Sequence, residues 1–131
     1  MEKINCVLLI DDDPTTNYIN ESLLHDLNIS KETIVFTNAT EALAFLERDC
    51  EGRCPELILL DIKMPVIDGF EFLEEFEKLM FKNKENVKVV MLSSSLIPKE
   101  VEISRNLGAT DYLQKPLTTG KLGRLMHSYF N

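Results

Sequence analysis

The stretch Leu57–Gly69, which reads LILLDIKMPVIDG, predicts the fold around which the rest of the chain is arranged. Its first four residues are apolar and do not alternate with polar ones, which is typical of a strand buried on both faces of a parallel sheet. Such a strand has no room for a charge. We therefore expect Asp61 to lie at its carboxyl end, where open parallel sheets bind their ligands.

Composition indicates one ordinary soluble domain covering residues 1–131. The chain has 131 residues, 44% of them hydrophobic, and a net charge of −8. An acidic chain is a poor partner for nucleic acid, because phosphate binding needs a basic surface. No apolar run approaches the roughly 18 residues of a membrane helix, and the N-terminus does not resemble a signal peptide. We therefore expect a cytoplasmic protein with no nucleic-acid or membrane partner.

Hydrophobic periodicity and turn residues predict five strands alternating with five helices. The predicted strands are Ile4–Ile10, Thr33–Thr37, Leu57–Leu60, Val87–Leu92 and Thr110–Leu113. The predicted helices are Pro14–Leu27, a second one capped by Asn38, then Phe70–Phe81, Pro98–Leu107 and Thr118–Tyr129. This alternation predicts an α/β doubly wound parallel sheet with helices on both faces.

Two of these helices have a predicted buried face, read from apolar residues at helical spacing. The first helix should bury Ile19, Leu23, Leu24 and Leu27. The third should bury Phe72, Leu73, Phe76 and either Leu79 or Met80.

Right-handed crossovers point the carboxyl ends of all parallel strands toward one edge of the sheet. Four groups of polar residues follow four of the predicted strands, and we expect them to gather at that edge: Asp11–Asp13, Asp61, Ser93–Ser95 and Lys115. Two close carboxylates repel by about 4 kcal/mol at an effective dielectric of 20. They therefore share a proton or hold a cation, and oxygen ligands suit Mg²⁺.

Such a site is suited to a phosphoryl group. Asp61 is the natural nucleophile, because an aspartate can form an acyl phosphate. The metal ion and Lys115 would offset charge on the transferred group, and Ser93 would donate a hydrogen bond to it.

Other polar residues have a simpler interpretation. Asp13 precedes Pro14, so we interpret it as a helix N-cap rather than a ligand. Asp68-Gly69 is mostly turn chemistry. Cys50 and Cys54 lie at helical spacing without a nearby His, so we expect free thiols rather than a metal pair.

The ordered set of these residues resembles the receiver domain of two-component response regulators. It comprises Asp11-Asp12 after the first strand, Asp61 within LLDIKMPVIDG, Ser93 after the fourth strand, and Lys115-Pro116 after the fifth, with Gly108 and Tyr112 before them. The resemblance covers essentially the whole chain and implies a flavodoxin-like sheet with strand order 2-1-3-4-5.

The resemblance also implies a role for each residue. Asp61 would be phosphorylated, Asp12 would bind Mg²⁺ directly, and Asp11 would bind it partly through water. The backbone carbonyl of Lys63 would be a further ligand. Ser93 and Lys115 would contact the phosphoryl group, the Lys115-Pro116 bond would be cis, and Tyr112 would change rotamer with the switch.

These roles predict a stand-alone signalling switch rather than an enzyme acting on other substrates. A histidine kinase or phosphotransfer protein would phosphorylate Asp61 with Mg²⁺ in a phosphorelay. Since the chain stops near the end of its last helix, we expect no output domain. Output would then pass to a partner protein through the face made by helix 98–107, strand 110–113 and helix 118–129.

Two alternatives remain open. In the first, the chain is a metal-dependent phosphatase with Asp61 as nucleophile, although Lys63 occupies the place of the second acid. In the second, it is a degenerate receiver that only binds a partner, although its acidic set is complete.

Overall fold

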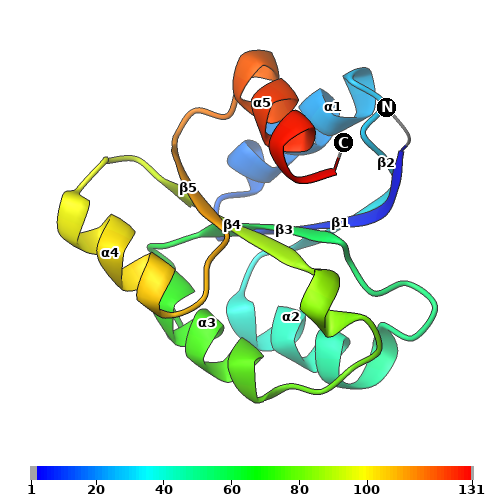
Figure 1. Cartoon of the computed structure of the whole chain (residues 1–131), viewed down its shortest axis with the longest axis vertical. Coiled ribbons are helices and arrows are strands. Elements are labelled where there is room, and N and C mark those ends of the chain that lie inside the picture. The colour runs from blue at the N-terminus through cyan, green and yellow to red at the C-terminus, as the bar shows by residue number, and fades with distance from the viewer. Residues whose placement is uncertain (1–2, 131) are drawn as a thin grey trace.

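The computed structural model describes residues 3–130, which form a five-stranded parallel sheet with strand order β2-β1-β3-β4-β5 (Figure 1). The strands are β1 (Ile4–Ile10), β2 (Ser30–Phe36), β3 (Leu57–Asp61), β4 (Lys88–Ser93) and β5 (Asp111–Gln114). The helices are α1 (Pro14–Asp26), α2 (Ala39–Ala44), α3 (Gly69–Lys78), α4 (Pro98–Asn106) and α5 (Thr119–Phe130). A π-helical turn, η1 (Phe45–Asp49), extends α2, and a 3-10 turn, η2 (Lys84–Asn86), precedes β4. The predicted fold class and strand order are confirmed.

The sheet is buried on both faces, as the unbroken apolar run of β3 predicted. Helices α1 and α5 cover one face, and α2, α3 and α4 cover the other (Figure 1). Successive β3 side chains point to opposite faces, so Ile58 and Leu60 pack with α2 and α3 while Leu57 and Leu59 pack with α1 and α5. Each of the two hydrophobic cores thus depends on every second residue of the central strands.

The predicted buried face of α1 is partly wrong. Leu24 is buried, but Ile19 is 56% exposed and Leu27 is 37% exposed. The other buried residues of α1 are Asn17 and Asn20. Apolar spacing alone missed this rotation, because two polar side chains share the buried face of α1 with Leu24.

The predicted end of α3 is also wrong. Phe72, Leu73 and Phe76 are buried as expected, but the helix ends at Lys78 and Met80 is 89% exposed. The Lys84 ammonium group donates hydrogen bonds to two carbonyl groups at this end, those of Glu77 (2.8 Å) and Leu79 (2.6 Å). A side chain from the next loop therefore satisfies acceptors that a longer helix would have paired internally.

The prediction of free thiols at Cys50 and Cys54 is wrong. Cys50 and Cys54 form a disulfide, with their Cα atoms 4.6 Å apart, and Cys6 remains a buried free thiol. The turn after η1, with Gly52 at φ +81°, brings the two sulfur atoms together.

Within residues 3–130, none of the helices combines the length and the apolar character needed to cross a bilayer.

Candidate functional site

Asp61 lies at the carboxyl end of the central strand β3, as predicted. It pairs with Leu92 of β4, and only 6% of its surface is exposed. It is therefore a carboxylate held by buried strands on both sides and open only at the edge of the sheet.

Gly69, the first residue of α3, lets that helix begin directly against the backbone of Asp61. Its amide donates a 2.7 Å hydrogen bond to the carbonyl of Ile62. A Cβ atom at this position would lie 2.8 Å from the Asp61 carbonyl oxygen and 2.8 Å from the Ile62 Cα atom. Only glycine fits there without moving backbone, so the Asp68-Gly69 pair does more than make a turn. Asp68 is the N-cap of α3 and forms a capping box with Glu71.

Two further carboxylates come from the end of β1. Asp11, Asp12 and Asp61 each place one carboxylate oxygen within 4.8 Å of the others. Asp11 is buried, and its carbonyl accepts a 2.8 Å hydrogen bond from the side-chain amide of Asn17 on α1. Asp12 is exposed. The first helix thus fixes the backbone that carries these acids.

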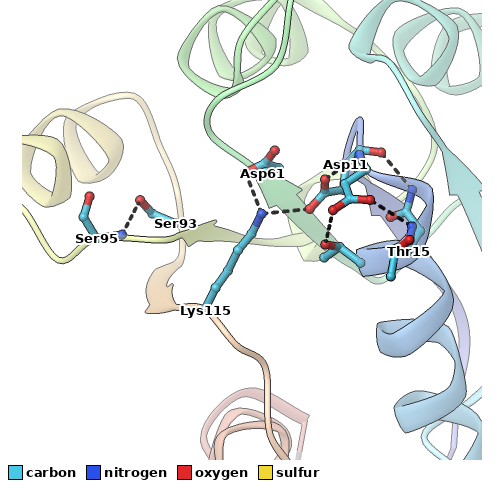
Figure 2. A network of polar contacts seen from close by, with 9 residues as sticks. Asp11, Thr15, Asp61, Ser93, Ser95 and Lys115 are labelled. Carbon is cyan, nitrogen blue, oxygen red and sulfur yellow. Dashed lines mark hydrogen bonds and ion pairs between the residues drawn. The ribbon is translucent and has the colours of Figure 1, made fainter.

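Lys115 reaches this cluster from the end of β5. Its ammonium nitrogen lies 3.0 Å from Asp11 Oδ2 and 3.0 Å from Asp61 Oδ1, as Figure 2 shows. Its backbone amide donates a 2.7 Å hydrogen bond to the Ser93 carbonyl, which extends the pairing of β4 and β5. The Lys115-Pro116 peptide bond is cis, as expected.

Burial and charge oppose each other at Asp61. The pKa of its carboxyl group is raised from 3.8 to about 6, mainly by burial and less by the neighbouring Asp11 and Asp12, while the Lys115 ammonium acts to lower it. The pKa of Lys115 is raised: its burial acts to lower the value, but hydrogen bonds to Asp11 and Asp61 outweigh that effect. Lys115 is therefore a permanent cation in a cluster whose central acid titrates near neutral pH.

Ser93 ends β4 and is 2% exposed. Its hydroxyl oxygen accepts a 3.2 Å hydrogen bond from the Ser95 amide (Figure 2). The Ser95 carbonyl in turn accepts a 3.0 Å hydrogen bond from the Tyr112 hydroxyl. Tyr112 is turned inward with 9% exposure, and its hydroxyl also lies 3.3 Å from Glu100 Oε1 on α4. A continuous polar path therefore joins the end of β4 to α4 and β5.

Two nearby residues stand outside the carboxylate cluster. Asp13 caps α1, because its carboxylate accepts a 2.9 Å hydrogen bond from the Thr15 amide, which confirms the simpler interpretation. Lys63 lies two residues after Asp61 with its side chain exposed. The role expected for its carbonyl stays a prediction.

Sequence reasoning missed three residues that shape the site: Gly69, Asn17 and Glu100. The spacing of Gly69 after Asp61 was visible as part of the quoted stretch, but its contact with the Asp61 backbone was not. Asn17 and Glu100 have no local signal, because their partners lie on other elements.

The carboxylate cluster fits a small divalent cation. When ionised, its three carboxylates and one ammonium group leave a net charge of −2. The 4.8 Å spread of the ligand oxygens is close to the roughly 4.2 Å between opposite ligands of a Mg²⁺ ion with 2.1 Å bonds. The donor set is all oxygen, which this cation prefers.

Comparisons with known proteins agree with this geometry. Residues 7–127 match the family model described as the response regulator receiver domain. A two component response regulator from Cytophaga hutchinsonii has a similar crystal structure, with 33% identity, a TM-score of 0.88 and 99% of each chain covered.

Two curated relatives each match 94% of this chain. An uncharacterized 14.6 kDa protein of Leptolyngbya boryana is 32% identical over 123 residues, which is 94% of this chain and 88% of that protein. The probable C4-dicarboxylate response regulator DctR of Bacillus subtilis is 26% identical over 123 residues, again 94% of this chain. This chain spans only 51% of the length of DctR.

Proposed function

This chain belongs to the response regulator receiver domain family, and from that membership we propose that it is a signalling switch phosphorylated on Asp61. The observation that carries the proposal is the convergence of Asp11, Asp12 and Lys115 on the Asp61 carboxylate. The phosphodonor would be a histidine kinase or phosphotransfer protein, and the protein would be cytoplasmic.

The transfer needs Asp61 ionised and positioned. A carboxylate oxygen of Asp61 attacks phosphorus, a new O–P bond forms, and the N–P bond to the donor histidine breaks as its imidazole nitrogen leaves. The Lys115 ammonium, already 3.0 Å from Asp61 Oδ1, would neutralise charge on the transferred group. Mg²⁺, when bound by the carboxylates of Asp11, Asp12 and Asp61 and by the Lys63 carbonyl, would supply further positive charge there.

The response would pass along the path from Ser93 to Tyr112. If the Ser93 hydroxyl turns to the phosphoryl group, it gives up the hydrogen bond that it accepts from the Ser95 amide. Ser95 also holds the Tyr112 hydroxyl through its carbonyl, so the loop, Tyr112 and Glu100 would shift together. A partner protein would read the change on the face made by α4, β5 and α5.

We expect no steady turnover of free phosphomonoesters, because the chain would act only on its own phosphoryl group. Lys63 stands two residues after Asp61, where a second acid would be needed for a phosphatase. Sustained release of phosphate from such substrates would contradict this part of the proposal.

The test uses acetyl phosphate or phosphoramidate with Mg²⁺, followed by intact mass. Wild-type protein should gain one phosphoryl group, and Asp61→Asn and chelator-treated protein should gain none. Asp12→Asn should need a higher Mg²⁺ concentration to reach the same yield of phosphorylated protein. Asp13→Asn is the matched control, because Asp13 lies in the same loop but caps α1, so this variant should still be phosphorylated. No adduct on the wild type, or an adduct that persists in Asp61→Asn, would refute the assignment.

The proposed path from Ser93 to Tyr112 is tested by comparing hydrogen exchange with and without phosphoramidate and Mg²⁺. Amides of the loop after β4, of α4 and of β5 should change, and those of α2 should serve as an internal control. A change confined to the residues around Asp61 would contradict the proposed path.

A further inference from the structure

All three cysteines line one hollow at the amino-terminal end of the strands, opposite to Asp61. Cys50 and Cys54 are joined there by a disulfide, and Cys6 on β1 is a free thiol. The proposed phosphorylation uses none of them. We propose that the Cys50–Cys54 pair is a site of reversible thiol oxidation that exchanges with low-molecular-weight thiols and disulfides.

The position of the bridge in the chain argues against a purely structural cross-link. Cys50 and Cys54 are four residues apart, so the closed ring is small. A disulfide restrains the unfolded chain more when it closes a longer loop. A bridge from Cys6 on β1 to either partner would enclose a far longer loop, and the structure leaves that thiol unpaired.

Cys50 and Cys54 differ in exposure, and this difference determines which sulfur atom an external thiolate attacks. Cys50 is 2% exposed, whereas Cys54 is half-buried and follows the exposed residues 51–53. An external thiolate can therefore reach Cys54, with Cys50 as the leaving group. The Leu46 carbonyl lies 3.5 Å from Cys50 Sγ, so the released thiol would have an acceptor in place.

Cys6 is kept out of this exchange by its surroundings. It is 1% exposed, and burial, with a smaller contribution from nearby Glu32, raises the pKa of its thiol to about 11. A thiol attacks a disulfide only as its thiolate. Cys6 therefore remains protonated beside the pair and does not rearrange it.

The ring also restrains Arg53, which lies inside it. The Arg53 guanidinium pairs with Glu32 of β2, with Nη2–Oε2 at 2.6 Å and Nε–Oε1 at 3.3 Å, and lies 5.7 Å from the centre of the Phe45 ring. Opening the disulfide would free the backbone on both sides of this residue. Reduction should therefore loosen the loop that joins η1 to β3.

The oxidation is a two-electron exchange with a disulfide such as glutathione disulfide. The Cys54 thiolate attacks one sulfur of glutathione disulfide and releases one glutathione, leaving a mixed disulfide on Cys54. The Cys50 thiol then loses its proton and attacks Cys54 Sγ, which forms the ring and releases the second glutathione. The two cysteines are oxidised, glutathione disulfide is reduced, and reduction of the pair runs these steps backwards.

The test incubates the folded chain of residues 1–131 at fixed ratios of reduced to oxidised glutathione. The reaction is quenched with acid, and the unfolded chain is alkylated before its intact mass is measured. Wild type should move between three alkylated cysteines and one, and return when the ratio is reversed. Cys6→Ser should keep the transition, between two and none. Cys50→Ser should lose it and carry glutathione on Cys54 instead.

Three alkylated cysteines at every ratio would overturn the proposal, because no disulfide would form. One alkylated cysteine at every ratio would also overturn it, because the bridge would then be permanent while the chain is folded. A bridge mapped to Cys6 would do the same. These readouts need no phosphorylation, so their failure is separate from that of the signalling proposal.

Trypsin tests the effect on the loop. The bond after Arg53 should be cut faster in the reduced chain than in the oxidised chain. Cys54→Ser is the control and should be cut at the faster rate under both conditions. Equal rates for reduced and oxidised wild type would overturn the link between the disulfide and this loop.

Discussion

The ammonium nitrogen of Lys115 lies 3.0 Å from Oδ1 of Asp61, although 54 residues separate them in the sequence. The contact exists because β5 and β3 end at the same edge of the sheet, on either side of β4. It sets the balance at the site, since burial raises the pKa of the Asp61 carboxyl while this ammonium lowers it. Burial therefore disfavours the ionised form of Asp61, and the Lys115 ammonium favours it.

Asp61→Asn should stabilise the metal-free protein at neutral pH. The folded-state pKa of about 6 lies above the usual 3.8, so the folded chain binds more protons than the unfolded chain, and stability falls as pH rises through this window. The shift corresponds to a penalty of up to about 3 kcal/mol at pH 7, which the amide lacks. Urea unfolding should show a gain of about 1–3 kcal/mol at pH 7 that shrinks toward zero near pH 4. Glu21→Gln, at an exposed position of α1, is the control, and an equal gain for Asp61→Asn at every pH would contradict the prediction.

Gly69→Ala should destabilise the fold, whereas Gly123→Ala should not. The new Cβ at residue 69 would meet Asp61 and Ile62 backbone at 2.8 Å, and such overpacking costs about 1–3 kcal/mol. At Gly123, in α5, nothing lies within 4 Å, and alanine is favoured over glycine in a helix by up to about 1 kcal/mol. Denaturant unfolding of the pair measures the difference. Similar stability changes in both variants would show that α3 does not press against the Asp61 backbone.

Tyr112→Phe should lower stability by about 0.5–1.5 kcal/mol, the usual net contribution of one hydrogen bond. The hydroxyl donates to the Ser95 carbonyl at 3.0 Å from a ring that is 9% exposed. Tyr18→Phe is the matched control, because Tyr18 is 71% exposed and its change should be near zero. Thermal unfolding of the unphosphorylated protein measures both. An equal effect in the two variants would mean that Tyr112 is not anchored inward.

Val66→Gly should stabilise the protein, which is unusual for a valine replacement. Val66 has φ +70°, and the amide of Ile67 donates a 2.8 Å hydrogen bond to the carbonyl of Pro65 around it. This tight turn costs a β-branched residue about 1–2 kcal/mol, and Val66 is 91% exposed, so little packing is lost. Val87→Gly, at an ordinary φ of −74°, should instead destabilise. Urea unfolding that shows a loss of stability for Val66→Gly would contradict the expected relief of strain.

Much of the fold could be predicted because its signals are local. The β1 prediction, Ile4–Ile10, matches the structure, and the apolar run before Asp61 correctly indicated a strand covered on both faces. Turn and cap residues located most helix starts, including Pro14 after the Asp13 cap. The acids, the serine and the lysine could be assigned to one edge because parallel strands with right-handed crossovers end on the same side.

What the sequence alone determined was the order of elements and the set of groups at one edge of the sheet. What only the tertiary structure decided was how side chains from different elements meet: the rotation of α1 that exposes Ile19, the end of α3 at Lys78 beside the Lys84 ammonium, and the disulfide between Cys50 and Cys54. The same holds for Gly69 against Asp61 and for Tyr112 against Glu100. Periodicity reports which residues prefer burial within one element, whereas these contacts depend on the packing of several elements at once.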